Sequence, residues 1–513
     1  MAKKGLPPII YILGAILFAL GLNSLLRSRP SGFDIISTSD RGGGDRDALI
    51  LLGDTFSGYS TFRDGEFNAT LDESGLKLSY RDVFDQGERA AMLNRGEADL
   101  LVTTLDRFLQ HQPGGRIVAL IDRTIGADAV VLNTPAYPQL KSLDDLANLG
   151  GTPEIAYAAD TPSEYLARVL DVQFAGFELS RFQVRGTVDA SEAWALLRDP
   201  SQAIAVAVLW EPFVTQAQRE GHTVVLSSED TPNTIVDVLV ASDRAIERDP
   251  EAIATLLTDY YRHIDSNTQN NARLRAQIQT DGGLTDDEAG LVLDGIDFFT
   301  SVETERWMQD GTLDRRLQAT GAILALAGEL DSPPESPTAL YTNSFIRDAV
   351  ANTDTLIALV EADNPQLAAA LRGQPIEQSA PEPDAAAVRQ EVQAAEPIGN
   401  LNIRGEVKFS TGSAQLTGDS LTTLDRLAAE IREFNADTVA VRVIGHTSRT
   451  GAAQFNQTLS QKRAQSVVNY LQSKGVDRKI IAEGKGYSEP LPNVAPTDIR
   501  NQRTEVRLVR LDS

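Results

Sequence analysis

The sequence predicts an α/β protein of several domains, and three observations support that prediction. From residue 48 onward, short apolar runs alternate with amphipathic stretches, a pattern typical of strands followed by helices. A segment rich in Pro, Ala and Glu separates this region from a second α/β pattern at the C-terminal end. One long apolar run near the N-terminus has the length of a membrane-spanning helix. A chain of 513 residues is long enough for roughly two to four domains.

The apolar run covers residues 8–26 and is just long enough to cross a bilayer core. Lys3 and Lys4 precede it, which favours a cytoplasmic N-terminus, although two arginines after the run weaken that assignment. No small-residue cleavage site follows the run. We therefore expect residues 1–30 to be an uncleaved single-pass membrane anchor. Residues 31–46 are then a flexible tether.

Residues 47–330 are predicted to form the first folded part of the chain. The predicted strands are residues 48–52, 76–80, 98–104, 115–121, 128–132, 154–159, 203–210 and 223–227. The predicted helices between them are residues 63–68, 87–95, 143–149, 163–173 and 190–197, and residues 250–330 are mostly helical. Alternation of this kind indicates parallel sheets covered by helices on both faces.

The remaining chain divides into three predicted segments. Residues 331–373 are predicted to form a helical extension, with a helical stretch over roughly 343–371. Residues 374–400 have almost no large apolar side chains and are predicted to be an extended, solvated linker. Residues 401–513 form a compact α/β unit. Its predicted strands are 403–408, 438–444, 480–483 and 504–510, and its predicted helices are 417–434 and 456–473.

Composition excludes several classes of function. The formal net charge is −25, which argues against nucleic acid as a partner, because phosphate binding needs concentrated Lys and Arg. The chain has no cysteine, which rules out disulfides, thiolate zinc sites and cysteine nucleophiles. Its four histidines are scattered, and it lacks HExxH, P-loop and GxSxG motifs. We therefore expect a protein that is not an enzyme and that needs neither cofactor nor metal.

The stretch from residue 441 to residue 470 is predicted to cradle a carboxylate. It reads as a strand, a polar turn with two glycines, and a helix. The turn and the first part of the helix place Thr447, Ser448, Asn456 and Arg463 near one another. Arg offers a forked set of donors, and the turn offers backbone N–H groups, so the arrangement suits an anionic carboxylate.

The C-terminal unit resembles the OmpA-like peptidoglycan-binding family in five ordered blocks. The blocks are VKFSTGSAQLT (407–417), GHTSRTG (445–451), NQTLSQKRAQSVVNYL (456–471), GKGYSEP (484–490) and NQRTEV (501–506). The resemblance implies that Arg463 holds the diaminopimelate carboxylate of a peptidoglycan stem, with Asn456 also matching. The family has Asp where this chain has Ser448, so weaker binding or an altered stem preference is expected. The alternatives are a fold that binds nothing and an Arg463 that is merely an exposed helix residue.

The first folded part resembles type 2 periplasmic solute-binding proteins. The motifs, in order, are GEADLLVTT (96–104), DRTIGADAVVL (122–132), SLDDLANLGG (142–151), ADTPSEYLARVL (159–170), AVLWEPFV (207–214) and TPNTIVDVLVAS (231–242). The resemblance, to the nitrate, sulfonate and taurine group in particular and to phosphate binders, implies two α/β lobes joined by crossover strands. A small solute, such as phosphate, nitrate or a sulfonate, would bind in the cleft between the lobes.

In such a fold the contacts come from loops at strand ends and from helix N-termini. The candidate solute-binding residues are Thr55, Ser57, Gly58, Tyr59, Thr103, Thr104, Asp128, Thr161, Ser163, Glu164, Trp210 and Glu211. Hydroxyls and free N–H groups suit an anion without any cationic side chain. The rival interpretation is that Asp128, Glu164 and Glu211 recognise a cation or an amine. Ser163 can equally be a plain helix cap, and Trp210 a core aromatic.

The sequence as a whole predicts a non-enzymatic envelope protein that binds a small solute and attaches to peptidoglycan. It would serve either as the substrate-binding component of an ABC-type importer, with a permease as partner, or as a sensor. The alternative is a structural envelope tether whose solute-binding fold no longer binds a ligand.

Overall fold

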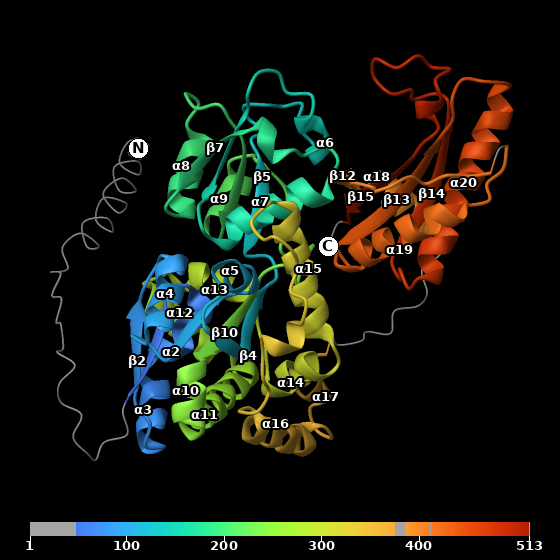
Figure 1. Ribbon diagram of the computed structural model, residues 1–513. Coiled ribbons are helices and arrows are strands. Elements are labelled where there is room, and N and C mark those ends of the chain that lie inside the picture. The colour runs from blue at the N-terminus through green and yellow to red at the C-terminus, as the bar shows by residue number, and fades with distance from the viewer. Residues whose placement is uncertain (1–47, 375–384, 411, 512–513) are drawn as a thin grey trace, which may run out of the picture. The chain divides into compact units, whose positions relative to one another are not determined.

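The computed structural model describes residues 48–374, 385–410 and 412–511 (Figure 1). The predicted membrane anchor and tether, residues 1–46, lie outside the described residues. Within the described ranges, no helix is both long and apolar enough to span a membrane.

The first lobe is built on a six-stranded sheet in the order β11-β4-β10-β3-β1-β2. Its strands are β1 (Leu49–Gly53), β2 (Leu78–Asp82), β3 (Leu100–Thr104), β4 (Gly115–Thr124), β10 (Val236–Ser242) and β11 (Ile296–Phe298). Every residue of β3 and β10 is buried, as expected for central strands with helices on both faces. The helices around this sheet are η1 (Ser57–Tyr59), α2 (Ser60–Arg63), α3 (Gly65–Glu73), α4 (Gln86–Arg95), α5 (Leu105–His111), α10 (Asp243–Arg248), α11 (Pro250–Gln269), α12 (Asn271–Gly282), α13 (Asp286–Asp294), α14 (Ser301–Gln309) and α15 (Thr312–Leu326).

The second lobe has a five-stranded sheet in the order β7-β6-β8-β5-β9. Its strands are β5 (Asp128–Leu132), β6 (Glu154–Ala158), β7 (Gln183–Thr187), β8 (Ile204–Trp210) and β9 (Thr223–Ser227). Its helices are α6 (Leu143–Leu146), α7 (Pro162–Gln173), η2 (Leu179–Arg181), α8 (Ala190–Arg198) and α9 (Phe213–Arg219). Figure 1 shows α7, α8 and α9 flanking this sheet.

The chain passes twice between the lobes, through residues 125–127 and 228–235. The prediction of parallel sheets was wrong for the strands next to these passages. β10 is antiparallel to β3 and β4, and β5 is antiparallel to β8 and β9. A strand that enters from the other lobe starts at the end of the sheet where the parallel strands finish. It therefore runs antiparallel to those strands.

The helical extension contains η3 (Pro337–Ala339), α16 (Arg347–Val360) and α17 (Pro365–Leu371). The helical stretch predicted over 343–371 is present as two helices, and the second begins at Pro365 because proline lacks the N–H that a helix interior needs. Asn364 caps the second helix by accepting a hydrogen bond from the Leu367 backbone N–H at 3.1 Å.

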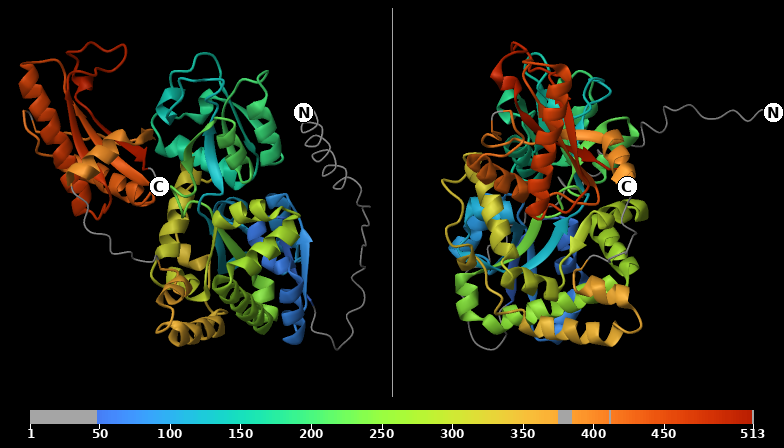
Figure 2. Two further views of the ribbon diagram at one scale, coloured as in Figure 1. Left: turned by 180° about the vertical axis from the view of Figure 1, so that it is seen from behind. Right: turned by 90° about the vertical axis from the view of Figure 1, so that its right-hand side faces the viewer.

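The C-terminal unit has a four-stranded sheet in the order β12-β15-β13-β14. Its elements are α18 (Ala385–Ala394), β12 (Glu396–Asn400), α19 (Gly418–Arg432), β13 (Val439–His446), α20 (Ala453–Ser473), β14 (Ile480–Gly486), η4 (Ile499–Asn501) and β15 (Thr504–Arg510). Figure 2 shows α20 lying along the sheet, and the Gln457 side chain fixes it there by donating to Gly484 O at 2.6 Å.

Two predictions for this unit were wrong. Residues 385–400 are not extended linker, because α18 packs Val392 against Ala440, Ile481 and Val509 on one face of the sheet. Residues 403–408 do not form a strand, and β12 instead takes the sheet edge by pairing with β15. The remaining segment of the predicted linker, 375–384, lies outside the described residues.

Candidate functional site

The C-terminal candidate site lies where β13 ends and α20 begins. Thr447 and Ser448 follow directly after the strand, and the Thr447 N–H donates to Gly486 O at 2.7 Å, which ties the turn to β14. Gly451 has a φ of +84°, a conformation that favours glycine, and it directs the chain into the helix. The turn is therefore held rigidly beside the N-terminal half of α20.

Arg463 projects from α20 into this site and is only 7 % exposed. Its Nε donates to Ser413 O at 3.0 Å, and its guanidinium lies 5.0 Å from the centre of the Phe409 ring. Among the described residues, no carboxylate forms a salt bridge with it. Burial lowers the pKa of Arg463, so the site disfavours the charge that the side chain carries. The partners of this buried cation are a backbone carbonyl, an amide oxygen of Gln502 and an aromatic ring.

Gln502 contacts both Arg463 and Ser448, two residues that the sequence predicts to lie close together. Its Oε1 lies 3.5 Å from Arg463 Nη1, and its Nε2 donates to Ser448 Oγ at 3.1 Å. Sequence reasoning did not nominate Gln502, although it lies in the matching block NQRTEV. Gln502 lies two residues before β15, and this position identifies it as a site candidate only when the order of the strands in the sheet is known.

The other two nominated residues have different surroundings. Asn456 uses its amide to donate to Thr450 O at 2.8 Å and to Ala452 O at 3.1 Å, so it shapes the turn. The Thr447 hydroxyl is buried and has no hydrogen-bond partner among the described residues. The site therefore consists of Arg463, Gln502 and Ser448, with Asn456 as support.

The candidate solute-binding residues gather at two sheet edges, one in each lobe. Strand directions place the ends of β1 and β3 at one edge, and the ends of β6 and β8 with the start of β5 at the other. In the first lobe these residues are Thr55, Ser57, Gly58, Tyr59, Thr103 and Thr104; in the second they are Asp128, Thr161, Ser163, Glu164, Trp210 and Glu211.

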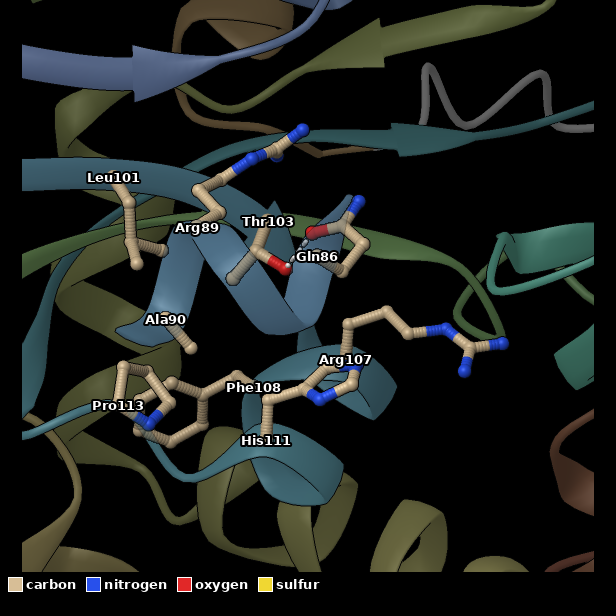
Figure 3. A pocket seen from close by; sticks show the side chains of 9 residues that line it. All are labelled: Gln86, Arg89, Ala90, Leu101, Thr103, Arg107, Phe108, His111 and Pro113. Carbon is tan, nitrogen blue, oxygen red and sulfur yellow. Dashed lines mark hydrogen bonds between the residues drawn. The ribbon is translucent and has the colours of Figure 1, made fainter. Parts of the chain in front are cut away.

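Two of the nominated polar groups in the first lobe, those of Tyr59 and Thr103, have hydrogen-bond partners, whereas the buried Thr104 hydroxyl has none among the described residues. Tyr59 is buried, and its hydroxyl donates to Asp237 on β10. Thr103 Oγ1 donates to Gln86 Oε1 at 3.0 Å, a contact that Figure 3 shows. Gly58 packs so closely that an added Cβ would lie 2.2 Å from Asp122 Oδ2. Thr104 is buried, whereas Thr55 is exposed.

A set of contacts that the sequence did not predict joins the two lobes, and we call it the inter-lobe latch. It consists of Arg107 and His111 on α5 and of Asp160, Thr161 and Glu164 around the start of α7. Arg107 donates to Thr161 O at 2.8 Å and lies 3.1 Å from Asp160 Oδ1 and 3.6 Å from Glu164 Oε2. His111 Nε2 lies 3.2 Å from the same Asp160 oxygen. Arg107 is 3 % exposed, whereas the side chains of His111 and Asp160 are 23 % and 39 % exposed, so the latch is buried at Arg107 and open to water at Asp160.

Asp160 supplies the carboxylate on which the contacts of Arg107 and His111 converge. Its φ is +55°, an uncommon conformation for a residue other than glycine. Burial raises the pKa of Asp160, but the His111 hydrogen bond, the Arg107 charge and the Gln86 backbone N–H at the start of α4 outweigh burial and lower it. A helix N-terminus, a guanidinium and an imidazole thus converge on a carboxylate of the protein itself.

Little free space remains beside the latch. The cavity lined by Gln86, Arg89, Thr103, Arg107, His111 and their apolar neighbours in the first lobe has a volume of about 10 Å³ (Figure 3). Such a volume holds about one water molecule. This cavity of the first lobe therefore has no room for a solute larger than water.

The candidate residues of the second lobe differ in burial, in hydrogen bonding and in the effect of burial on their pKa. Ser163 is fully buried with no partner for its hydroxyl among the described residues, and Glu164 accepts from the Asp160 N–H at 2.7 Å and from Arg168 at 2.7 Å. Glu211 accepts from the Thr215 hydroxyl at 2.8 Å, and burial raises its pKa. Trp210 pairs with Asp128 across β8 and β5 and is half-buried.

Asp128 makes stability depend on pH. Burial, with a contribution from Glu211, raises the pKa of Asp128 to about 7. A raised carboxyl pKa stabilises the folded state at low pH, and this stability is lost as the pH rises through 7. We expect Asp128→Asn to raise the free energy of unfolding by on the order of a few kcal/mol at pH 8 and to change it little at pH 4. Denaturant titrations at the two pH values measure this difference, and equal effects at both would contradict it.

Comparisons with known proteins agree with this geometry. Residues 408–504 match the OmpA family. The chain is 39 % identical to Outer membrane protein A of Shimwellia blattae over 93 residues, 18 % of this chain and 39 % of that protein. It is also 39 % identical to Outer membrane protein A of Klebsiella aerogenes over 92 residues, 18 % of this chain and 26 % of that protein. The chain thus spans well under half the length of each of these relatives.

Among solved structures, the periplasmic aliphatic sulphonate binding protein of Escherichia coli aligns with 59 % of this chain and 100 % of its own. The identity is 15 % and the TM-score 0.45. The OmpA-like domain of FopA1 from Francisella tularensis subsp. tularensis aligns with 22 % of this chain and 73 % of its own, with 32 % identity and a TM-score of 0.19. The C-terminal part of the chain is therefore an OmpA domain, and it follows two α/β lobes that are connected through residues 125–127 and 228–235.

Proposed function

We propose that this protein is a non-enzymatic component of the cell envelope that attaches to peptidoglycan through its OmpA domain. The observation that carries the proposal is Arg463, a buried guanidinium that has no carboxylate partner among the described residues. A stem-peptide carboxylate would supply the missing charge, with two hydrogen bonds in a fork. Sedimentation of the full-length protein with purified sacculi tests the proposal.

Ser448 is the position at which the site can be strengthened. The Ser448 hydroxyl can only form neutral hydrogen bonds with a stem-peptide ammonium, whereas a carboxylate there would form a charge-assisted one. We expect Ser448→Asp to bind sacculi several-fold to about tenfold more tightly, because charge-assisted bonds are worth about 1.5–3 kcal/mol. Ser448→Asn, of similar size but uncharged, is the matched control. Equal binding by the Asp and Asn variants would refute this role for position 448.

The two lobes are proposed to bind a small anion such as phosphate, nitrate or a sulfonate. The support is the convergence of α4's N-terminus, Arg107 and His111 on the Asp160 carboxylate. An incoming anion would replace that carboxylate when the lobes open. The protein would act as a sensor, or as the substrate-binding component of an ABC-type importer with a permease as partner.

A structural tether is the second candidate, and a specific observation favours it. The inter-lobe latch joins the two lobes through the protein's own groups, because Arg107 contacts both Asp160 and Thr161. Thermal-shift measurements with phosphate, nitrate and methanesulfonate separate the two. A ligand at 100 times its dissociation constant adds about 2.7 kcal/mol of stability. If none of the three stabilises either the wild type or Asp160→Asn, the tether is the better account.

The proposed location is the inner membrane, with the bulk of the chain in the periplasm. This proposal rests on the apolar run at residues 8–26 and on the domain types that follow it. The domain boundaries proposed from the sequence are 1–30, 31–46, 47–330, 331–373, 374–400 and 401–513. N-terminal sequencing of the protein from membrane fractions tests the uncleaved anchor, because cleavage would remove the apolar run.

A further inference from the structure

The OmpA domain packs on the second lobe through a contact with an apolar centre. Phe434, just after α19, packs edge-on against Phe174 at the end of α7, with the ring centres 6.2 Å apart. Both side chains are buried. Gly399 of β12 fits so closely against the second lobe that an added Cβ would lie 3.1 Å from Phe174 Cδ1 and 3.2 Å from Leu143 Cβ. A buried apolar centre of this kind is typical of the core of a stable interface.

Hydrogen bonds from the main chain surround this centre. The Asn400 N–H donates to the Asp144 carboxylate at 3.0 Å, and the Ala175 N–H donates to Asn400 O at 2.9 Å. The Asn402 N–H donates to Gln173 O at 2.7 Å. Because backbone groups have fixed positions in the chain, these bonds set the orientation of the OmpA domain on the second lobe.

The OmpA domain also holds residues 228–235, one of the two connections between the lobes. The Arg510 guanidinium, at the end of β15, pairs with the buried carboxylate of Asp230. The Asn435 N–H donates to Asp230 O at 2.8 Å, and the Asn435 side chain donates to Glu229 O at 3.1 Å. Lobe opening requires the connecting segments to change their backbone angles, so contacts that fix one of these segments resist opening.

A further contact reaches α15, the helix that packs against both α5 of the first lobe and α7 of the second. Arg316 of α15 pairs with Glu433, which lies next to Phe434 in the OmpA domain. The OmpA domain therefore contacts the second lobe, a connection between the lobes and a helix that both lobes share. When the lobes move apart, these three surfaces must move relative to one another.

We propose that the OmpA domain is a brace that opposes opening of the two lobes while it is docked. The proposed peptidoglycan site lies at the opposite end of the sheet from the Arg510 contact. Thr504 pairs with Gly445 just before that site, whereas Arg510 pairs with Val439, roughly 20 Å further along β15 at about 3.3 Å per residue. Docking thus leaves the peptidoglycan site free, and the brace does not depend on whether the domain binds peptidoglycan.

Two pairs of spin labels on the full-length, cysteine-free chain measure docking and lobe opening separately. Labels at Gln218→Cys and Gln472→Cys report the distance between the second lobe and the OmpA domain. Labels at Glu73→Cys and Gln218→Cys report the distance between the two lobes. All three positions are exposed.

Two variants undock the domain through different contacts. Gly399→Leu places a side chain against two residues of the second lobe, and Arg510→Glu places a second carboxylate beside Asp230. Gly418→Leu is the matched control, because an added Cβ at this exposed glycine meets no atom within 4 Å. We expect both interface variants to lengthen or broaden both distance distributions and the control to change neither.

Hydrogen exchange provides a second measurement at the connection itself. Residues 228–235 should exchange about tenfold faster in Gly399→Leu and in Arg510→Glu than in the wild type, since loss of one hydrogen bond to a charged group corresponds to at least about that factor. Docking that persists in both variants would overturn the assigned interface. Unchanged exchange at residues 228–235, or an unchanged distance between the lobes once the domain has undocked, would overturn the brace.

Discussion

An Arg463→Met variant of the full-length protein is expected to lose its sedimentation with peptidoglycan sacculi while keeping its fold. The guanidinium is the one group in the site that can neutralise a carboxylate and bond to it with two donors. Loss of a charge-assisted hydrogen bond costs about 1.5–3 kcal/mol, so the apparent affinity should fall about ten- to a hundredfold. Sedimentation measured across a range of sacculus concentrations gives this ratio.

Stability separates a binding role for Arg463 from a structural one. Burial lowers the pKa of Arg463, which means that the folded state disfavours its charge when no anion is bound. Arg463→Met should therefore unfold at the same denaturant concentration as the wild type or a higher one. Replacing a residue that the fold needs would instead lower the denaturant concentration at which the protein unfolds.

Two further variants complete the test. Arg463→Lys keeps the charge but loses the planar fork, and it should bind with intermediate affinity. Lys462→Met removes an exposed cation from the next position of the same helix and should leave binding unchanged. The peptidoglycan proposal is lost if Arg463→Met and the wild type sediment equally.

Local sequence signals predicted the elements that are stabilised locally. α4 begins after Asp85, which accepts from the Glu88 N–H, and it ends at Gly96 with a φ of +73°. α7 begins at Pro162 after the cap Thr161. Caps, prolines and glycines act within a few residues, so a single sequence contains the information that they carry.

Features that depend on distant partners were not predictable in the same way. α18 looks like solvated linker because its few apolar residues are small, and Val392 becomes a core residue only when Ala440 and Val509 lie beneath it. Gln502 joins Ser448 and Arg463 only because β15 lies next to β13. The opposite direction of β10 follows from the second crossing between the lobes and leaves no mark in its own seven residues.

The inter-lobe latch is the least predictable feature of the candidate solute site and the one with the largest expected effect on stability. Arg107 is paired with Asp106 at 3.1 Å, and these two side chains are 3 % and 2 % exposed. Burial raises the pKa of Asp106, and the Arg107 charge opposes that rise. Removing one partner of a buried ion pair leaves an uncompensated charge and costs about 3–5 kcal/mol. We expect Arg107→Ala to lower the free energy of unfolding by that amount in denaturant titrations.

The Asp160→Asn substitution tests the latch without removing the buried ion pair between Arg107 and Asp106. The Asp160 side chain is 39 % exposed, so its loss should reduce the free energy of unfolding only slightly. Because its pKa is lowered in the folded state, its contribution is present above the pKa of an unfolded Asp and is lost as the pH falls below that value. Acid should therefore weaken the latch of the wild type more than that of the Asn variant.

Opening of the lobes can be measured directly because the chain has no cysteine. Spin labels at Glu73→Cys and Gln218→Cys, both exposed, report the distance between the first and second lobes. The Asp160→Asn background should lengthen or broaden that distance distribution, and added sulfate should narrow it again by occupying the vacated position at α4, Arg107 and His111. A distribution that is the same in both backgrounds, with and without sulfate, would mean that packing rather than the latch holds the lobes together. The two-lobed fold would then act as a rigid tether, since an anion can close only a cleft that opens.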